Sequence, residues 1–219
     1  MKQNKPLAIG LVICTALFIL TASIAAPILI RGFYYIQIKP LGIMEETGLS
    51  MGQIRQAYNE MMDFCIGRSN LFSTGELAWS EWGRSHFVDV RSLFSLNLWV
   101  LLISGLLLSI WFMVKRKAQM GSQYLAGRSV GYWAGSALLT TFAVIGGLGA
   151  IDFNKAFTIF HKIFFPGKDN WLFDWRTDPI ILFLPQTFFR NCAIFILAAV
   201  LLGCSACILY DFCRKKDND

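Results

Sequence analysis

The sequence predicts a mainly α-helical, polytopic membrane protein with four transmembrane helices and a small extracellular α+β cap. Of its 219 residues, 55% are hydrophobic and only 16% are charged, which is too apolar for an ordinary soluble domain. Four apolar runs also reach the roughly 20 residues that a helix needs to cross a bilayer. The net charge of +6 does not indicate nucleic-acid binding, because the basic residues stand at the ends of the apolar runs. We interpret them as topology signals.

The apolar runs cover residues 7–30, 93–114, 130–151 and 188–210. The first follows Lys2 and Lys5 and contains the small residues of 22–26, so a cleaved signal peptide is an alternative to a transmembrane helix. Because the run is long and continues past those small residues, we expect an uncleaved first span.

The distribution of lysine and arginine predicts the orientation in the membrane. The segments on one side of the four spans (1–6, 115–129 and 211–219) hold nine Lys/Arg in 30 residues, and those on the other side (31–92 and 152–187) hold ten in 98. The positive-inside rule makes the basic side cytoplasmic. Both termini are therefore expected inside, and both long loops outside.

This arrangement divides the chain into five parts. They are the cytoplasmic N-terminus with the first span (1–30), the extracellular cap (31–92), the second and third spans with a basic cytoplasmic turn (93–151), an interfacial helix with an aromatic outer loop (152–187), and the fourth span with a cytoplasmic tail (188–219). The four spans predict a multi-pass membrane protein. The sequence carries no signal for an oligomeric state.

Within the cap we expect a strand, a helix and a hairpin. The aromatic and β-branched stretch 34–38 predicts a short strand. Ser50 and Gln53 resemble a capping box, and Gly67 suits the end of the helix that follows. The turn signal in 71–82 predicts a hairpin. The apolar stripe of the helix is more typical of a core than of a ligand site; it comprises Ile54, Ala57, Tyr58, Met61 and Cys65.

His86, one of only two histidines, comes directly before the second span. If Ser85 caps a helix that continues into the membrane, His86 and Asp89 lie on one face, where the carboxylate can orient the imidazole. Alternatively, Asp89 and Arg91 are interface anchors and His86 is only a polar cap residue. The residues alone leave both possibilities open.

The second histidine, His161, lies in a segment with the pattern of an interfacial helix. Apolar residues fall on one side and polar residues on the other, which is typical of a helix in the interface plane. The apolar stripe consists of Phe153, Ala156, Phe157, Phe160, Ile163 and Phe164. Trp171 and Trp175 follow, and they suit an ordinary aromatic belt or the wall of a pocket equally well.

Other polar or small-residue motifs carry no predicted chemistry. Cys204 and Cys207 share a helix face inside a span, where close packing is the expected role, and Cys65 is the only cysteine in an outer loop. The glycines of 146–149 lack the Lys-Ser/Thr of a phosphate loop and favour tight helix packing. Two separated histidines without a third ligand do not predict a metal site.

Four motifs in order resemble one bacterial membrane family. They are His-Phe-Val-Asp-Val-Arg at 86–91, Phe-Thr-Ile-Phe-His-Lys-Ile-Phe-Phe at 157–165, Trp-Leu-Phe at 171–173 and Asp-Pro-Ile-Ile-Leu-Phe-Leu-Pro at 178–185. The chain is similar over almost its whole length to the family that includes the lipoprotein intramolecular transacylase.

The resemblance implies an acyltransferase whose substrate is a diacylated bacterial lipoprotein held in the phospholipid bilayer. An acyl chain would move from the glyceryl sn-2 ester to the α-amino group of the same N-terminal cysteine, giving a lyso-form lipoprotein. The catalytic histidines of the family match His86 and His161. We assign Asp89 to orienting His86, and Arg91, Trp171 and Asp178 to positioning the headgroup or forming the pocket wall. No cofactor or metal is implied.

The chemistry of the residues agrees with this reaction. An α-amino group titrates near pH 7.7–8.0, so a neutral imidazole can take its proton as the nitrogen attacks the ester. The departing glyceryl oxygen needs a proton in return. We expect one histidine to act as the base and the other as the acid or oxyanion donor, and the sequence does not assign the two roles.

The residues leave two alternative functions open and count against a third, a transporter. A transporter usually carries ionisable residues near the bilayer midplane, and the centres of these spans have essentially none. A non-enzymatic membrane protein could use an aromatic cap to bind an exported partner. A membrane ester hydrolase could use the same two histidines, and analysis of the product separates it from a transferase.

Overall fold

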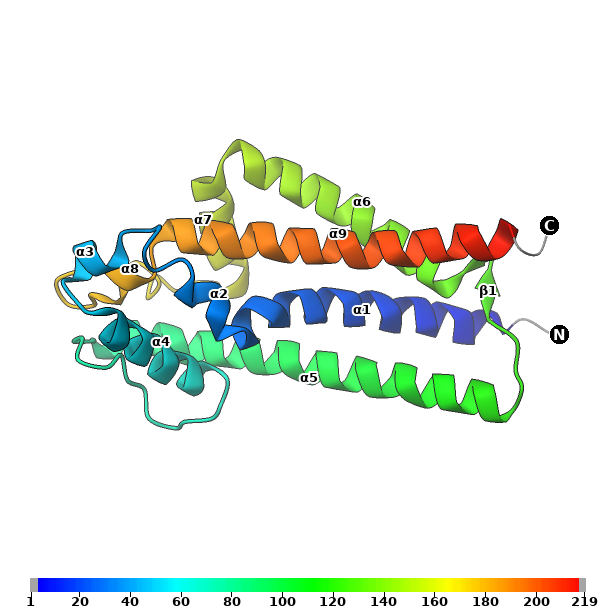
Figure 1. Ribbon diagram of the computed structural model, residues 1–219, viewed down its shortest axis with the longest axis horizontal. Helices are drawn as coiled ribbons and strands as arrows, with labels where there is room; N and C mark the ends of the chain where they lie inside the picture. The colour runs from blue at the N-terminus through cyan, green and yellow to red at the C-terminus, as the bar shows by residue number, and fades with distance from the viewer. Residues whose placement is uncertain (1–3, 217–219) are drawn as a thin grey trace. The chain divides into compact units, whose positions relative to one another are not determined.

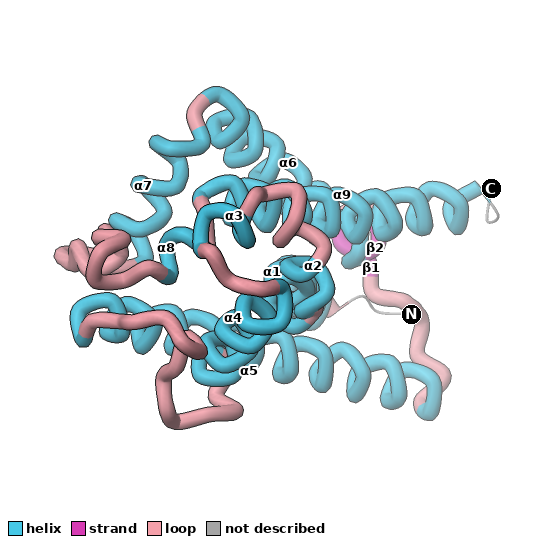
Figure 2. Tube along the Cα trace, turned by 60° about the vertical axis from the view of Figure 1, so that its left-hand side comes forward, coloured by secondary structure: helices cyan, strands magenta, loops and turns pink. Residues whose placement is uncertain are grey.

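The computed structural model describes residues 4–216 and consists mainly of helices. The long helices are α1 (Lys5–Leu29), α5 (Glu81–Lys117), α6 (Val130–Ile151) and α9 (Gln186–Lys216). The shorter helices are α2 (Arg31–Tyr35), α3 (Ile43–Thr47), α4 (Met51–Cys65), α7 (Phe153–Phe164) and α8 (Ile180–Phe183). Figure 2 shows that most of the described chain is helical.

The four predicted spans are confirmed as helices that are long and apolar enough to cross a membrane. Large apolar side chains remain exposed along them, as a lipid environment permits; on α5 they include Leu102, Leu106, Leu107 and Ile110, each at least half exposed. The second span is the least well predicted, because α5 begins 12 residues before the expected start at residue 93. His86 therefore lies within the same continuous helix as the span.

The chain divides into two compact units. The first comprises Met1–Ile24, Asn97–Leu148 and Ile196–Asp219, and the second comprises Ala25–Leu96 and Gly149–Phe195. In the first unit α1 and α5 lie side by side (Figure 1), and Asn97 Nδ2 donates to the carbonyl oxygen of Thr21 across 3.1 Å. The buried Asp211 accepts from the Arg128 guanidinium at 3.0 Å and from the backbone N–H of Ser129 at 2.7 Å.

The predicted strand at 34–38 and the predicted hairpin at 71–82 are wrong. The structure describes all of residues 31–92 and has no strand among them. Tyr34 lies instead at the end of α2, where its fully buried ring stacks on Tyr58 at 3.9 Å and its hydroxyl donates to Phe183 O at 2.7 Å. This packing overrides the β propensity of the local sequence. The pairing of β1 (Tyr124–Leu125) with β2 (Arg128–Ser129) occurs in the predicted cytoplasmic turn.

The predicted α4 helix is confirmed in detail. Ser50 and Gln53 form the capping box, and Gly67, with φ of 79°, adopts the left-handed conformation just beyond the helix end. The predicted stripe is buried throughout: Ile54, Ala57, Tyr58, Met61 and Cys65 are all at most 3% exposed. This stripe is part of the buried core of the second unit.

Candidate active site

His86 lies in the second turn of α5, and its helix begins earlier than the sequence predicts. Ser80, not Ser85, occupies the capping position, because Ser80 Oγ accepts from Gly83 N at 2.9 Å. The Ser85 hydroxyl instead donates to the carbonyl oxygen of Trp82 at 2.6 Å within the helix. Predicting a cap at Ser85 was therefore wrong, although His86 and Asp89 do stand three residues apart on one helix.

The imidazole of His86 is 6% exposed and is surrounded by aromatic rings. Phe87, Phe165 and Phe173 meet it edge to face, with centroid distances of 5.7, 4.9 and 5.6 Å. Its Nδ1 atom is buried and has no hydrogen-bond partner within residues 4–216. Packing with rings therefore holds the position of this imidazole but leaves one nitrogen unsatisfied.

The imidazole of His161, also 6% exposed, is held more completely. Asp152 caps α7 by accepting from Lys155 N at 3.0 Å, and His161 stands in the last turn of that helix. Its Nδ1 lies 2.7 Å from the carbonyl oxygen of Phe157, one turn earlier, and its ring stacks on Trp171 at 4.5 Å. Because a carbonyl oxygen only accepts, Nδ1 carries the proton, and Nε2 of the neutral ring has a free lone pair.

The two histidines come together in the second unit. Their ring centroids are 5.7 Å apart and the rings are tilted by 31°. Phe165 contacts both rings, at 4.9 Å from His86 and 5.7 Å from His161. Residues 75 positions apart in the sequence thus form one pair that can act on a single reacting group.

Burial lowers the pKa of His161 below its ordinary value of 6.5, and the bond to the Phe157 carbonyl opposes this effect only partly. The ring is therefore neutral at neutral pH. A neutral imidazole with a free Nε2 lone pair is able to act as a general base.

Asp89 lies beside the pair, but both of its oxygens are taken by other partners. Oδ1 forms an ion pair with Lys168 Nζ at 2.6 Å, and Oδ2 accepts from Asn170 Nδ2 at 3.1 Å. Asn170 Nδ2 also donates to Ser85 Oγ at 3.0 Å. Asp89 thus links α5 to the loop after α7, and its negative charge acts on the His86 ring from close by.

Arg91 and Asp178 make structural contacts. The Arg91 guanidinium donates to Ser69 O at 2.9 Å and to Asn70 Oδ1 at 3.1 Å. Asp178 is 3% exposed; its oxygens accept from the N–H and the hydroxyl of Ser80, each at 2.7 Å, and this fastens the start of α5. Of the four positioning residues named from the sequence, Trp171 is the one whose ring contacts a histidine directly.

Sequence reasoning missed Lys168, Asn170 and Ser80. Asn170 stands between Asp169 and the aromatic Trp171, and no local pattern separates its side chain, which is 4% exposed, from that of a solvated loop residue. Ser80 carried a weak signal, because a serine followed by a helical sequence suits an N-cap. The ion pair of Lys168 with Asp89 depends on the fold and has no sequence signal.

Other potentially reactive groups lie outside this pair. Burial raises the pKa of the Cys65 thiol to about 12, so that thiol is not an activated nucleophile. Among residues 4–216, no three His, Cys, Asp or Glu side chains are grouped so that they could hold a metal ion.

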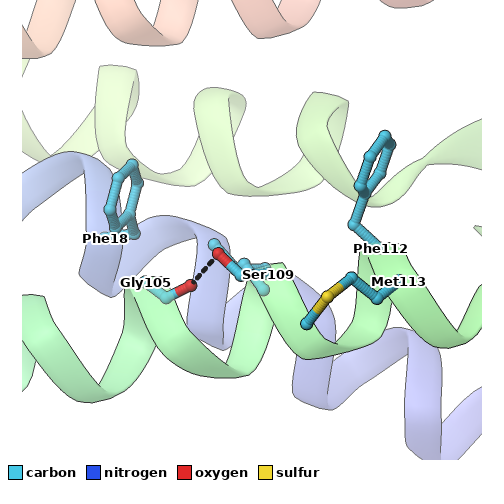
Figure 3. Close-up of a pocket in the computed structure, with 6 residues that line it drawn as sticks. Phe18, Gly105, Ser109, Phe112 and Met113 are labelled. Atoms are coloured by element: carbon cyan, nitrogen blue, oxygen red, sulfur yellow. Dashed lines mark hydrogen bonds between the residues drawn. The ribbon is translucent and has the colours of Figure 1, made fainter.

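A groove of about 440 Å³ lies in the first unit along α1 and α5 (Figure 3). It is lined by Phe18, Gly105, Leu108, Ser109, Phe112 and Met113. The Ser109 hydroxyl donates to the Gly105 carbonyl of its own helix at 2.8 Å, so the lining is essentially apolar. Such a groove suits contact with hydrocarbon and contributes no reactive group.

Comparison with known proteins points to one family. The family model described as lipoprotein intramolecular transacylase Lit matches residues 9–189. The structure is similar to that of the integral membrane lipoprotein intramolecular transacylase Lit from Bacillus cereus, with 25% identity and a TM-score of 0.82, covering 96% of this chain and 95% of that chain. No curated protein sequence matches significantly.

Two further structures of the Bacillus cereus protein share the fold. In one a histidine is replaced by arginine and in the other by alanine, and each is 24% identical with a TM-score of 0.76. They cover 97% and 95% of this chain, and 93% of their own length.

Proposed function

The chain belongs to the lipoprotein intramolecular transacylase family and is an acyltransferase, and we propose that His86 and His161 perform the proton transfers of its reaction. The acyl chain moves from the glyceryl sn-2 ester of a diacylated lipoprotein to the α-amino group of the same N-terminal cysteine. The product is a lyso-form lipoprotein. The observation that carries the proposal is the 5.7 Å separation of the two buried imidazole rings.

His161 is the base at the attacking amine. Its Nδ1 proton is committed to the Phe157 carbonyl, so Nε2 is the atom that accepts a proton from the substrate. The lowered pKa keeps this nitrogen free of a proton at neutral pH. Stacking on Trp171 holds the ring so that the lone pair keeps a constant direction.

His86 is the acid at the ester. The α-amino group is largely protonated near neutral pH, and in our proposal its first proton passes to Nε2 of His86. The free amine then attacks the ester carbonyl, a C–N bond forms, and the second proton passes to His161. As the C–O bond breaks, His86 returns its proton to the glyceryl oxygen. His161 then releases one proton to water, so each proton is accounted for.

Holding the amine close to the ester contributes the rest of the rate enhancement. The amine and the ester belong to one substrate molecule, and effective molarities for well-oriented intramolecular reactions reach ~10⁵–10⁸ M. General acid–base catalysis adds typically ~10²–10⁴-fold. A direct attack by the amine forms no acyl-enzyme, so the mechanism requires no serine or cysteine nucleophile.

The reaction takes place at the outer face of a bacterial cell membrane, with both termini in the cytoplasm and residues 31–92 and 152–187 outside. The bias of Lys and Arg supports this orientation. The 37 residues of α5 extend about 55 Å, whereas the hydrocarbon core is about 30 Å thick, which leaves room for the turns with His86 beyond it. Ile159, Phe160, Ile163 and Phe164 of α7 are 46–65% exposed, as suits a helix in the interface plane.

Mass spectrometry of an N-terminal lipopeptide tests the proposed function. A diacylated lipoprotein is expressed with and without this protein in a bacterium that has no N-acylating activity. We expect a product of unchanged mass in which one acyl chain has moved to the amino group, as fragment ions show. Loss of one acyl chain would instead identify an ester hydrolase, and an unchanged lipopeptide would favour a non-enzymatic binding protein.

A further inference from the structure

Asn170 is almost completely buried beside His86, and the orientation of its amide is determined by its neighbours. Its Nδ2 donates to Asp89 Oδ2 at 3.1 Å and to Ser85 Oγ at 3.0 Å. A carboxylate only accepts, and the Ser85 hydroxyl has its own proton committed to Trp82 O at 2.6 Å. Both partners therefore require the NH₂ group of Asn170, and its carbonyl oxygen points elsewhere.

This arrangement leaves two buried polar atoms without a hydrogen-bond partner among the described residues. Within residues 4–216, the only buried side-chain nitrogen or oxygen atoms without a hydrogen-bond partner are Asn170 Oδ1 and His86 Nδ1. Leaving a buried polar group unpaired is destabilising. The two atoms are chemically complementary, because Oδ1 is an acceptor and Nδ1 of an imidazole can carry a proton. The residues that hold Asn170, Ser85 and Asp89, lie on both sides of His86 along α5.

We propose that Asn170 is a positioning residue that holds His86 in the tautomer with a proton on Nδ1, by accepting that proton's hydrogen bond at Oδ1. Nε2 is then the atom that exchanges protons with the substrate. When Nε2 is protonated, the Asn170 oxygen and the Asp89 carboxylate both stabilise the positive ring. Asn170 does for His86 what the Phe157 carbonyl does for His161. The inference rests on the proposed role of His86 as the acid.

Two independent features of the loop after α7 support a positioning role. Lys168, two residues earlier, forms the ion pair with Asp89 at 2.6 Å, which keeps the carboxylate against the amide. Trp171, the next residue, stacks on His161. One short loop thus contacts the surroundings of one histidine and the ring of the other, so that Asn170 couples the positions of both.

Nitrogen NMR of the full-length protein in detergent micelles tests the tautomer directly. The chain has only two histidines, so ¹⁵N-histidine labelling gives two imidazoles, and His161→Gln assigns them. With both rings neutral, we expect His86 to carry its proton on Nδ1 in the unmodified protein. In Asn170→Leu, which keeps the side-chain volume but offers no acceptor, we expect the Nε2-protonated form to appear. A His86 ring protonated on Nε2 in the unmodified protein would overturn the proposal.

Kinetics on a synthetic diacylated lipopeptide give the functional measurement. We expect kcat of Asn170→Leu to fall ~10–100-fold, the usual consequence of losing a hydrogen bond to a charged group, with little change in KM. Asn154→Leu, at an exposed position on α7, is the matched control and should retain kcat. An unchanged kcat in Asn170→Leu would remove Asn170 from the mechanism.

A second variant separates orientation from folding. Asn170→Gln keeps both the acceptor oxygen and the NH₂ group on a side chain that is longer by one methylene, so we expect the Nδ1-protonated tautomer to persist while kcat falls less than in Asn170→Leu. Equal loss of kcat and of the tautomer in both variants would indicate a purely structural role. If His86→Ala retains activity, the proposed function itself is wrong, whereas an inactive His86→Ala beside a fully active Asn170→Leu overturns only the role of Asn170.

Discussion

The two histidines of the site are equally buried but are held in different ways. His161 satisfies Nδ1 with the carbonyl of Phe157, four residues earlier in the same helix, and stacks flat on Trp171. His86 meets the phenylalanine rings around it edge to face, and its Nδ1 has no partner within the described part of the chain. The protonation of His161 is thus determined locally, whereas that of His86 depends on segments distant in sequence.

This difference suits the two chemical roles. A base works best with one fixed lone pair, which a backbone carbonyl on the other nitrogen provides. Both rings gain and lose a proton in each turnover, and the acid has in addition to deliver its proton to the glyceryl oxygen. The Lys168–Asp89 ion pair and Asn170 place adjustable polar groups near His86 and not within the aromatic stack around His161.

The largest expected effect comes from removing proton transfer at either ring. In His161→Gln and His86→Gln the side chain still forms hydrogen bonds but does not exchange protons near neutral pH. We expect N-acylation of a synthetic lipopeptide by each variant to fall by at least ~10²–10⁴-fold. Initial rates determined by mass spectrometry, with circular dichroism to verify folding, measure this.

His86→Gln also decides between two roles at the ester. If His86 only donates a hydrogen bond to the oxyanion, the glutamine amide replaces it and much of the activity remains. Near-normal turnover by His86→Gln would therefore contradict proton donation by His86. The matching experiment with His161→Gln has no such rescue, because a base must accept a proton.

A smaller effect is expected from disturbing the contact between Ser80 and Asp178, which holds the start of α5 a few residues before His86. A Cβ added at Gly83 would overlap the Asp178 carboxylate and lie 3.0 Å from Phe173, so no side chain fits. We expect Gly83→Ala to destabilise the protein by about 1–3 kcal/mol through overpacking. The midpoint of thermal unfolding in detergent measures the loss.

Gly147→Ala is the matched control, because Gly147 lies in helix α6 and a Cβ there has nothing within 4 Å. Alanine in an uncrowded helix position should be neutral or stabilising. Equal unfolding midpoints for the two variants would show that Asp178 moves aside freely and does not fasten α5.

The elements that sequence reasoning predicted well depend on strong periodic or local signals. The four apolar runs needed only their length, and α4 needed only its capping box and its stripe. The strand expected at 34–38 failed because Tyr34 packs against Tyr58 and Phe183, residues 24 and 149 positions away. The β propensity of a segment carries no information about packing partners that are distant in sequence. The early start of α5 followed from the same kind of distant contact, between Ser80 and Asp178.

The candidate site shows the same contrast between features with a local sequence signal and features that depend on distant contacts. Both histidines were predicted as a pair, because they are the only two and each stands at the edge of an apolar segment. The proximity of the two rings and the stacking of Trp171 were not derivable, since they depend on how α5, α7 and the loop after α7 pack together. Asn170 was missed altogether, because burial alone distinguishes it from the exposed Asp169.

The smallest expected effect concerns the acid side of the pH profile. His161 acts as the base in its neutral form, and burial lowers its pKa below 6.5, so activity should persist below pH 6.5 and fall only when the pH drops through that lowered pKa. Trp171→Ala exposes the ring to water, which weakens the desolvation. The pKa then rises toward 6.5, and the acid limb of kcat/KM moves to higher pH. Trp171→Phe keeps an aromatic ring in place and should shift the limb less.

Profiles of kcat/KM between pH 5 and 9 test this prediction for the unmodified protein, Trp171→Ala and Trp171→Phe. Because an aromatic pair is worth about 0.5–1.5 kcal/mol, the rate at pH 8 should change by no more than ~10-fold in Trp171→Ala. An acid limb at the same pH in all three proteins would show that the base is not His161. A limb that moves to lower pH in Trp171→Ala would show that Trp171 stabilises the protonated ring, and the stack would then favour the imidazolium form and oppose its role as a base.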